Sequence, residues 1–294
     1  MILPLSHACK SRSRLGGEQY WEKHVLRAEQ KAAYARDGYF ILRGLFNATE
    51  VGELKAAMAE LLAPLRPSDR SADIGFDPWQ QLAPALAPAG DDVNPHRVIY
   101  MNDLHLRHPR LNAHMRSVRI ASLFCELWEA DIDAFQSAAV IKPPGQDNEY
   151  HGWHQDMQDY VPLSSDRNGC IITYLHEMGR DTGGTSLVPG THTSPLDALP
   201  KRTYTPVSGW PDKLMKRGID GFDPGTANVL APDFLPGDAL IFHSSLYHRA
   251  NSNSDADSKI GLINVYMAED CIDVNGRNQF KAGDVRITRG RVLL

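Results

Sequence analysis

The sequence predicts a mainly β protein with flanking helices, in which a jelly-roll core follows a helical N-terminal part. From about residue 134 the chain contains short β-branched and aromatic runs, such as GCIITYLHEM and KIGLINVYMAED, each bounded by Gly, Pro, Asn or Asp. Such interrupted runs are typical of the strands of a β-sandwich or barrel. Before them, ATEVGELKAAMAELLAPL and RLNAHMRSVRIASLFCELWEA carry apolar residues at helical spacing.

The N-terminal elements follow in a simple order. GYFILRGLF at residues 38–46 predicts a strand, and Asn47 with Glu50 three residues later predicts the start of a helix. Residues 66–97, rich in Pro, Ala, Asp and Gly, predict a long irregular segment. We expect a single domain over residues 1–294, with a helical part at about 17–130 packed outside a jelly-roll core at about 134–270.

Composition narrows the range of partners. The 294 residues are 23% charged and 42% hydrophobic, as in soluble globular proteins. The net charge of −5 is spread over interspersed acids and bases, so we expect a small-molecule substrate and no nucleic acid or membrane partner. No run predicts a secretory signal or a membrane span, which favours a cytoplasmic location. Four cysteines without a CxxC pair argue against a thiolate zinc site, and no oligomeric state is predicted.

The stretch HGWHQDMQDY at residues 151–160 contains a candidate metal motif. His154 and Asp156 are alternate residues, so their side chains share one face if the segment is extended. LPGDALIFHSSLYHRANSNS offers His243 and His248 as a third ligand. Two histidines and one carboxylate on one face form the facial triad of non-haem Fe(II) oxygenases. Because a helical HExxH is absent, the pattern favours redox chemistry over hydrolytic zinc.

These motifs, in this order, resemble the phytanoyl-CoA dioxygenase family of Fe(II)- and 2-oxoglutarate-dependent oxygenases, which includes ectoine hydroxylases. The similarity extends from DGYFILRGLF to the strand that ends near Ala268, and WHQD, TSLVPGTH and PGDALIFHSSLYHRANSNS match in turn. The resemblance implies a double-stranded β-helix, the cupin-like form of the jelly roll. It also implies that His154, Asp156 and His248 bind iron, and that His243 has a role in packing or in the surroundings of the site.

The resemblance further implies which residues bind 2-oxoglutarate. Gln136 and Lys142 match family positions that contact this cosubstrate, and Lys259 occupies the position of the family's carboxylate-binding arginine. Arginine binds a carboxylate through two parallel hydrogen bonds, whereas lysine offers one charge on a flexible stem. We expect Lys259 to face inward, because strand alternation then also places Val265 inward. The alternative is a solvated Lys259, with Lys142 or Arg249 binding the carboxylate.

The implied enzyme uses Fe(II), 2-oxoglutarate and O2 to hydroxylate an unactivated carbon of a small molecule, in secondary metabolism, and it releases succinate and CO2. Related halogenases have a small residue in place of Asp156, so hydroxylation is favoured over halogenation, while desaturation, ring closure and ketone formation stay open. The alternative function is a non-redox jelly-roll metal protein, such as an isomerase, a hydrolase or a small-molecule-binding module. Residues 191–228 form a charged insertion that is either a substrate lid or a solvated loop.

Overall fold

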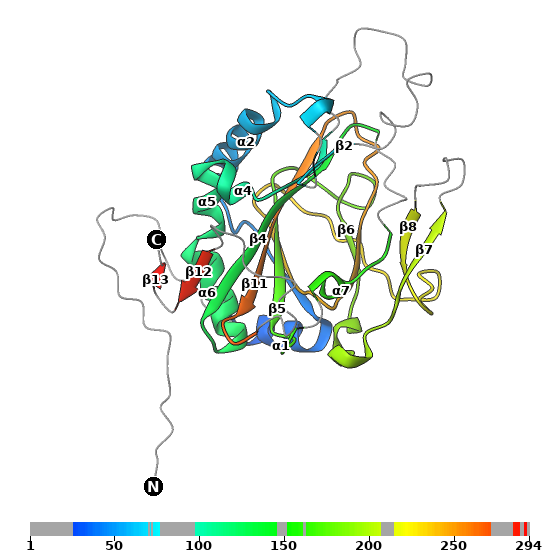
Figure 1. The fold of residues 1–294 in the computed structure, drawn as a ribbon. Helices are drawn as coiled ribbons and strands as arrows, with labels where there is room; N and C mark the ends of the chain where they lie inside the picture. Colours follow the sequence, from blue (N-terminus) through cyan, green and yellow to red (C-terminus); the bar gives the residue numbers. More distant parts are fainter. Residues whose placement is uncertain are drawn as a thin grey trace.

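The computed structural model, which describes residues 26–69, 71, 73–76, 98–145, 152–160, 163–206, 215–271, 285–288 and 291–292, contains two facing layers of strands. The larger sheet has nine strands in the order β1-β9-β5-β11-β4-β12-β13, with β3 on β4 and β2 on β3. The smaller sheet pairs β10 (Tyr247–Ala250) with β6 (Thr185–Val188), of which Figure 1 labels β6. The strands of the large sheet are β1 (Tyr39–Leu42), β2 (Ile74–Phe76), β3 (Val98–Asn102), β4 (Ile132–Lys142), β5 (Asn168–Tyr174), β9 (Ala239–His243), β11 (Lys259–Ala268), β12 (Val285–Thr288) and β13 (Arg291–Val292).

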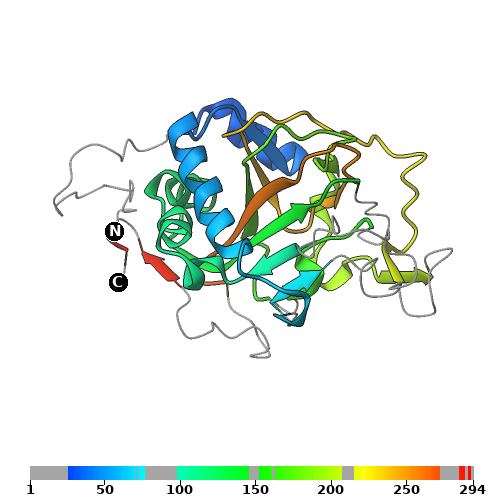
Figure 2. The same cartoon turned by 90° about the horizontal axis from the view of Figure 1, so that it is seen from above.

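Most of the helices, though not α7, cover the outer face of the large sheet, as Figures 1 and 2 show. The predicted helix start at Asn47 is confirmed: its side chain accepts a hydrogen bond from the Glu50 N–H, and the Glu50 carboxylate accepts one from the Asn47 N–H. The helices are α1 (Ala28–Asp37), α2 (Ala48–Leu62), α4 (Leu104–Arg107), α5 (Pro109–Met115), α6 (Val118–Trp128) and α7 (Met157–Tyr160), with 3-10 turns η1 (Pro67–Asp69), η2 (Thr191–Thr193) and η3 (Leu196–Ala198).

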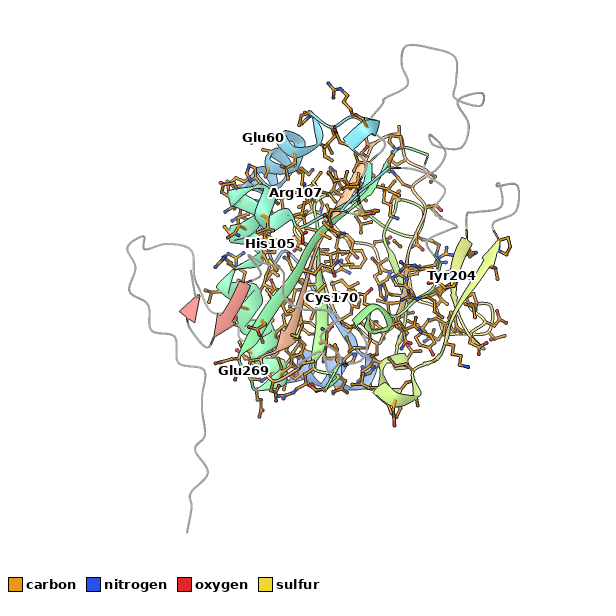
Figure 3. All side chains as sticks on the ribbon, viewed as in Figure 1. Glu60, His105, Arg107, Cys170, Tyr204 and Glu269 are labelled. Carbon is orange, nitrogen blue, oxygen red and sulfur yellow. The ribbon has the colours of Figure 1, made fainter. Side chains whose placement is uncertain are left out.

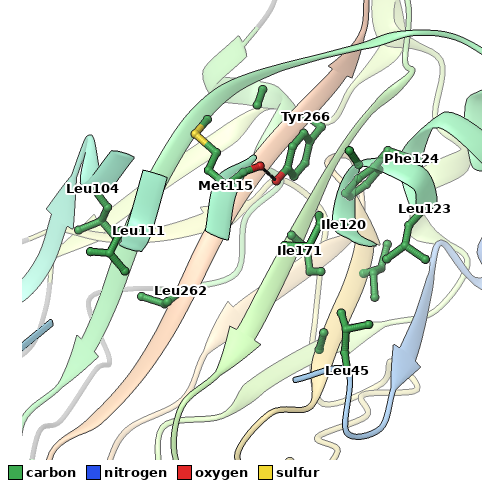
Figure 4. Packing of buried hydrophobic residues seen from close by; sticks show 14 of the residues in the cluster. Leu45, Leu104, Leu111, Met115, Ile120, Leu123, Phe124, Ile171, Leu262 and Tyr266 are labelled. Atoms are coloured by element: carbon green, nitrogen blue, oxygen red, sulfur yellow. Dashed lines mark hydrogen bonds between the residues drawn. The ribbon is translucent and has the colours of Figure 1, made fainter. Parts of the chain in front are cut away.

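The main hydrophobic core lies between these helices and the sheet. Leu111 and Phe124 pack from the helices onto Ile171 and Tyr266, which point outward from β5 and β11 (Figure 4). The Tyr266 hydroxyl donates a 2.7 Å hydrogen bond to the Met115 carbonyl, so the one polar atom of this buried ring has a partner. The helical layer is thereby anchored to the central strands of the sheet.

A second hydrophobic cluster fills the space between the two sheets. It joins residues of the inner face, including Phe242 and Val265, to Leu187 on β6 (Thr185–Val188). In β10 (Tyr247–Ala250), His248 lies opposite Leu187, so its side chain also faces this interior. The predicted jelly roll with helices outside it is therefore confirmed, and one interior wall carries a candidate metal ligand.

The structure refines several boundaries. β1 pairs with β9 and β3 pairs with β4, so the N-terminal part contributes strands to the sheet as well as helices. The segment predicted to be irregular contains β2, and its residues 77–97 lie outside the described part. The insertion at 191–228 contains a hairpin of β7 (Arg202–Pro206) and β8 (Met215–Ile219). In the described part of the chain, every helix is too short or too polar to cross a bilayer.

Candidate metal centre

His154 and His248 lie directly opposite each other at the edge of the small sheet. The His154 N–H donates to the His248 carbonyl at 3.0 Å, and the His248 N–H donates back to the His154 carbonyl at 3.1 Å. Opposite residues of an antiparallel pair point to the same side, and the two ring centroids are 4.2 Å apart. A main-chain bridge thus brings together two histidines that are distant in the sequence.

The residues after His154 are fastened to the turn that precedes His248. The Gln155 side-chain amide donates to the Ser245 carbonyl at 2.6 Å, and the Met157 N–H donates to the Ser244 carbonyl at 2.9 Å. Gln155 is fully buried. Sequence reasoning missed this residue, although a polar side chain between two candidate ligands of a buried segment was a usable signal.

Asp156 completes a compact cluster of three side chains. Its Oδ1 lies 3.5 Å from Nε2 of His154 and 3.5 Å from Nε2 of His248, and one ligand atom from each residue lies within 4.8 Å of the others. Nδ1 of His154 contacts the Gly152 carbonyl and Nδ1 of His248 contacts the Leu246 carbonyl, both at 2.9 Å. A carbonyl only accepts, so each Nδ1 carries a proton and each Nε2 is the ring nitrogen directed at the cluster.

The electrostatics suit a divalent cation. Burial lowers the pKa of His248 to about 4, with His154 acting in the same direction, so the ring is neutral at neutral pH. Burial acts to raise the pKa of Asp156, but charge interactions with His248 and His154 and hydrogen bonds with His154 and the Cys170 thiol hold it well below its ordinary value. The cluster therefore offers two imidazole nitrogens and one anionic oxygen, a donor set that suits Fe(II).

The other candidate third ligand lies elsewhere. His243 is at the end of β9, where its Nδ1 accepts a 3.0 Å hydrogen bond from the Ser245 N–H. Its ring packs 6.1 Å from that of Tyr34 and 5.4 Å from that of His192. It belongs to the outer face of the sheet, because its neighbour Phe242 points inward. His243 thus has a packing role.

Lys142 and Lys259 are directly opposite each other on β4 and β11 and share the inner face of the sheet. Both are buried, with 2% and 8% of their surface exposed, so the alternative of a solvated Lys259 is wrong. The Lys259 ammonium forms a 2.6 Å ion pair with Asp255. Arg249 lies 5.8 Å above the Trp153 ring on the opposite face of β10 from His248, since neighbouring strand residues point to opposite sides.

Gln136 also faces inward, at the other end of β4. It is paired with Val265, which is itself paired with Cys170 on β5. The Cys170 thiol contacts Asp156, with Sγ 3.1 Å from Oδ2, and burial raises the pKa of this thiol, so it is protonated. Gln136 therefore lies at the metal end of the interior and the two lysines at its far end. Sequence reasoning did not identify Cys170, for which an isolated apolar-strand cysteine gives no signal.

The model of the phytanoyl-CoA dioxygenase (PhyH) family matches residues 34–261. The chain belongs to the phytanoyl-CoA dioxygenase family. Ectoine dioxygenase of Sphingopyxis alaskensis is 25% identical over 253 residues, which are 82% of this chain and 76% of that protein.

Solved structures show the same fold. EctD from S. alaskensis with 2-oxoglutarate and 5-hydroxyectoine has a TM-score of 0.62 at 22% identity and covers 88% of this chain and 83% of its own. The carbocyclase SnoK from nogalamycin biosynthesis has a TM-score of 0.62 at 21% identity, with coverages of 92% and 94%. Family membership confirms the predicted enzyme class, a 2-oxoglutarate-dependent non-haem iron dioxygenase, and its cofactors iron and 2-oxoglutarate.

Proposed function

We propose that this enzyme hydroxylates an unactivated carbon of a small molecule in secondary metabolism, with iron bound by His154, Asp156 and His248. The observation that carries the proposal is the convergence of both Nε2 atoms on one Asp156 oxygen, each at 3.5 Å. Three protein donors on one side leave positions for the cosubstrate and O2. When bound, iron, 2-oxoglutarate and O2 supply the oxidant that turns C–H into C–OH, with release of succinate and CO2.

The protein's own groups set the geometry for this chemistry. The carbonyls of Gly152 and Leu246 fix the orientation of the two imidazoles, and such outer partners also increase the basicity of the ligand nitrogens. Asp156 supplies the single negative charge. Because its carboxylate occupies the third protein position, we propose hydroxylation instead of halogenation.

We propose that Lys142 and Lys259 together bind the far carboxylate of 2-oxoglutarate, in place of the family's arginine. Like charges directly opposite on neighbouring strands repel each other, and an anion between them relieves this repulsion. Asp255 neutralises Lys259 from the adjoining loop. An ammonium has three donor hydrogens, so Lys259 is able to bind Asp255 and a ligand carboxylate at once.

Gln136 is our candidate for the opposite end of the same cosubstrate. It lies six residues before Lys142 on the same face of β4, a Cα separation of about 20 Å at ~3.3 Å per residue. Both side chains are long, and leaning toward each other they bracket an extended dicarboxylate. Gln136 and Cys170 are both cross-strand partners of Val265, and the Cys170 thiol contacts Asp156. The Gln136 end of the interior therefore adjoins the proposed iron position.

The β7–β8 hairpin is our candidate cover for the small sheet beside the site. A Cβ added to Gly152 would lie 1.9 Å from the Arg217 carbonyl oxygen, so β8 runs directly against the residue that holds His154. Ile219 of the same strand packs with Trp153 and Val188. The place in secondary metabolism is supported by the fold shared with SnoK, a carbocyclase from nogalamycin biosynthesis.

The first test is anaerobic addition of Fe(II) and 2-oxoglutarate to the metal-free protein. We expect a visible metal-to-ligand charge-transfer band, its loss in His248→Ala, and succinate formation with O2 and a small-molecule panel. A folded wild-type protein that gives no band would refute the proposed function and favour the alternative, a non-redox metal protein.

The second test titrates 2-oxoglutarate into iron-loaded lysine variants and follows the same band. Loss of one charged hydrogen-bonding partner is expected to raise the dissociation constant by about 10-fold or more in Lys259→Ala and in Lys142→Ala. Lys259→Arg should bind at least as well as the wild type, and Lys201→Ala, at an exposed lysine, is the matched control. Unchanged affinity in both alanine variants would assign the carboxylate to another residue.

A further inference from the structure

The second carboxylate oxygen of Asp156 has its own partner inside the jelly roll. Oδ1 faces the two imidazoles, whereas Oδ2 accepts a 3.1 Å hydrogen bond from the Cys170 thiol. Cys170 is fully buried on the inner face of β5, and Figure 3 shows it in the interior between the two sheets. The two oxygens of this carboxylate are therefore directed to different partners.

The surroundings of the thiol determine the direction of this hydrogen bond. The Ser244 hydroxyl lies 3.8 Å from Cys170 Sγ, but it donates its hydrogen to the Asn168 side-chain oxygen. An ionised carboxylate only accepts, so the hydrogen between Cys170 and Asp156 belongs to the thiol. The two neighbouring strands, β9 and β11, hold the sulfur in place, because their residues Phe242 and Val265 are the cross-strand partners of Cys170.

This contact restricts how the carboxylate binds a cation. A carboxylate with both oxygens available is able to bind one metal ion through one oxygen or through both. When Oδ2 accepts a hydrogen bond from a rigidly held donor, that bond fixes the orientation of the carboxylate and competes with binding through both oxygens. Oδ1 is then the oxygen presented to the metal, and the positions opposite the protein ligands stay available.

We propose that Cys170 is a positioning residue, which holds Asp156 so that it binds iron through Oδ1 alone. This proposal rests on the proposed function, because it requires the triad to bind iron. Hydrogen-bond partners of metal ligands typically change metal affinity by about 10- to 100-fold when they are removed. The thiol acts through Asp156 and does not itself contact the metal.

The test compares anaerobic Fe(II) binding and the charge-transfer band in position-170 variants. Cys170→Ala and Cys170→Val both remove the donor, and the valine fills the same space, so both should weaken Fe(II) binding by about 10-fold and shift the band. Cys170→Ser keeps a donor and should stay within about 3-fold of the wild type. Cys271→Ala is the matched control: its buried thiol donates to the Ser165 carbonyl at 3.2 Å and should be neutral for Fe(II) affinity.

The outcomes separate this role from simple packing. Wild-type Fe(II) affinity and an unshifted band in Cys170→Val overturn the proposal even if Cys170→Ala fails to fold. A serine variant as weak as the valine variant overturns the role of the donor hydrogen. A wild-type protein that binds no Fe(II) overturns the proposed function as well, whereas failure at position 170 alone leaves that function standing.

Discussion

Replacement of Asn253 by alanine tests how the far end of the interior is built. The side-chain amide of Asn253 is fully buried and donates to the carbonyls of Lys142, Pro143 and Asp257 at 2.9, 3.1 and 2.9 Å. Its oxygen accepts a 3.1 Å hydrogen bond from the Asp255 N–H. One side chain thus ties the end of β4 to the loop that leads into β11.

The cost of Asn253→Ala follows from the hydrogens involved. The amide has two hydrogens for its three carbonyl partners, and it accepts a third hydrogen from Asp255. At about 1 kcal/mol net for each of these hydrogen bonds, the variant should lose about 3 kcal/mol of unfolding free energy. For a chain of this size that loss lowers the melting temperature by about 5 °C. The loop that presents Asp255 to Lys259 should also loosen, so 2-oxoglutarate should bind more weakly.

The assay is denaturant unfolding together with 2-oxoglutarate titration of the iron-loaded protein. Asn112→Ala is the matched control, because the Asn112 amide donates a single 2.9 Å hydrogen bond, to the His105 carbonyl, and its loss should cost no more than about 1 kcal/mol. An Asn253→Ala protein that is no less stable than Asn112→Ala would refute the reasoning. Unchanged 2-oxoglutarate affinity would separate the loop from the cosubstrate site.

Two further predictions concern close packing and acid stability. Gly152→Ala should reduce succinate formation by about 100-fold, because the added methyl group overlaps the Arg217 carbonyl and displaces the His154 segment by ~1 Å. Gly52→Ala is the control, because nothing lies within 4 Å of a Cβ added there. Equal turnover in the two variants would contradict the prediction. Burial lowers the pKa of His114 from 6.5 to about 3, with Arg110 acting likewise. The unfolded chain therefore binds more protons than the folded protein below pH 6.5, so the unfolding free energy should fall by up to ~1.4 kcal/mol per pH unit toward pH 3. Denaturant unfolding across this pH range should show a shallower dependence of unfolding free energy on pH in His114→Gln.

Local patterns were sufficient to predict the elements that depend on them. Alternation in β11 correctly placed Lys259 and Val265 on the inner face, because the period of a strand is two whatever the strand packs against. The helix start at Asn47 was readable for the same reason, since its capping residues are three positions apart. The pairing of β1 with β9 was not predictable, because register between distant strands is decided by the assembled sheet.

In the site, too, residues within local motifs were predictable, whereas residues that act through contacts between distant segments were not. The motif and the family resemblance led to His154, Asp156 and His248, which the structure brings together. The supporting contacts of Gln155 and Cys170 are interactions between segments, and neither residue belongs to a local pattern of its own. The ion pair of Lys259 with Asp255 was also missed, although the two residues are four positions apart across a turn.

The main-chain bridge between His154 and His248 has a consequence for how the protein depends on its metal. It closes a loop of roughly 90 residues, and closing such a loop costs about 4 kcal/mol of chain entropy in the unfolded molecule. An ion bound by both histidines is a removable cross-link across that loop, and it stabilises the folded state according to its concentration. Bound iron would then add to the stability of the folded protein as well as supply its chemistry.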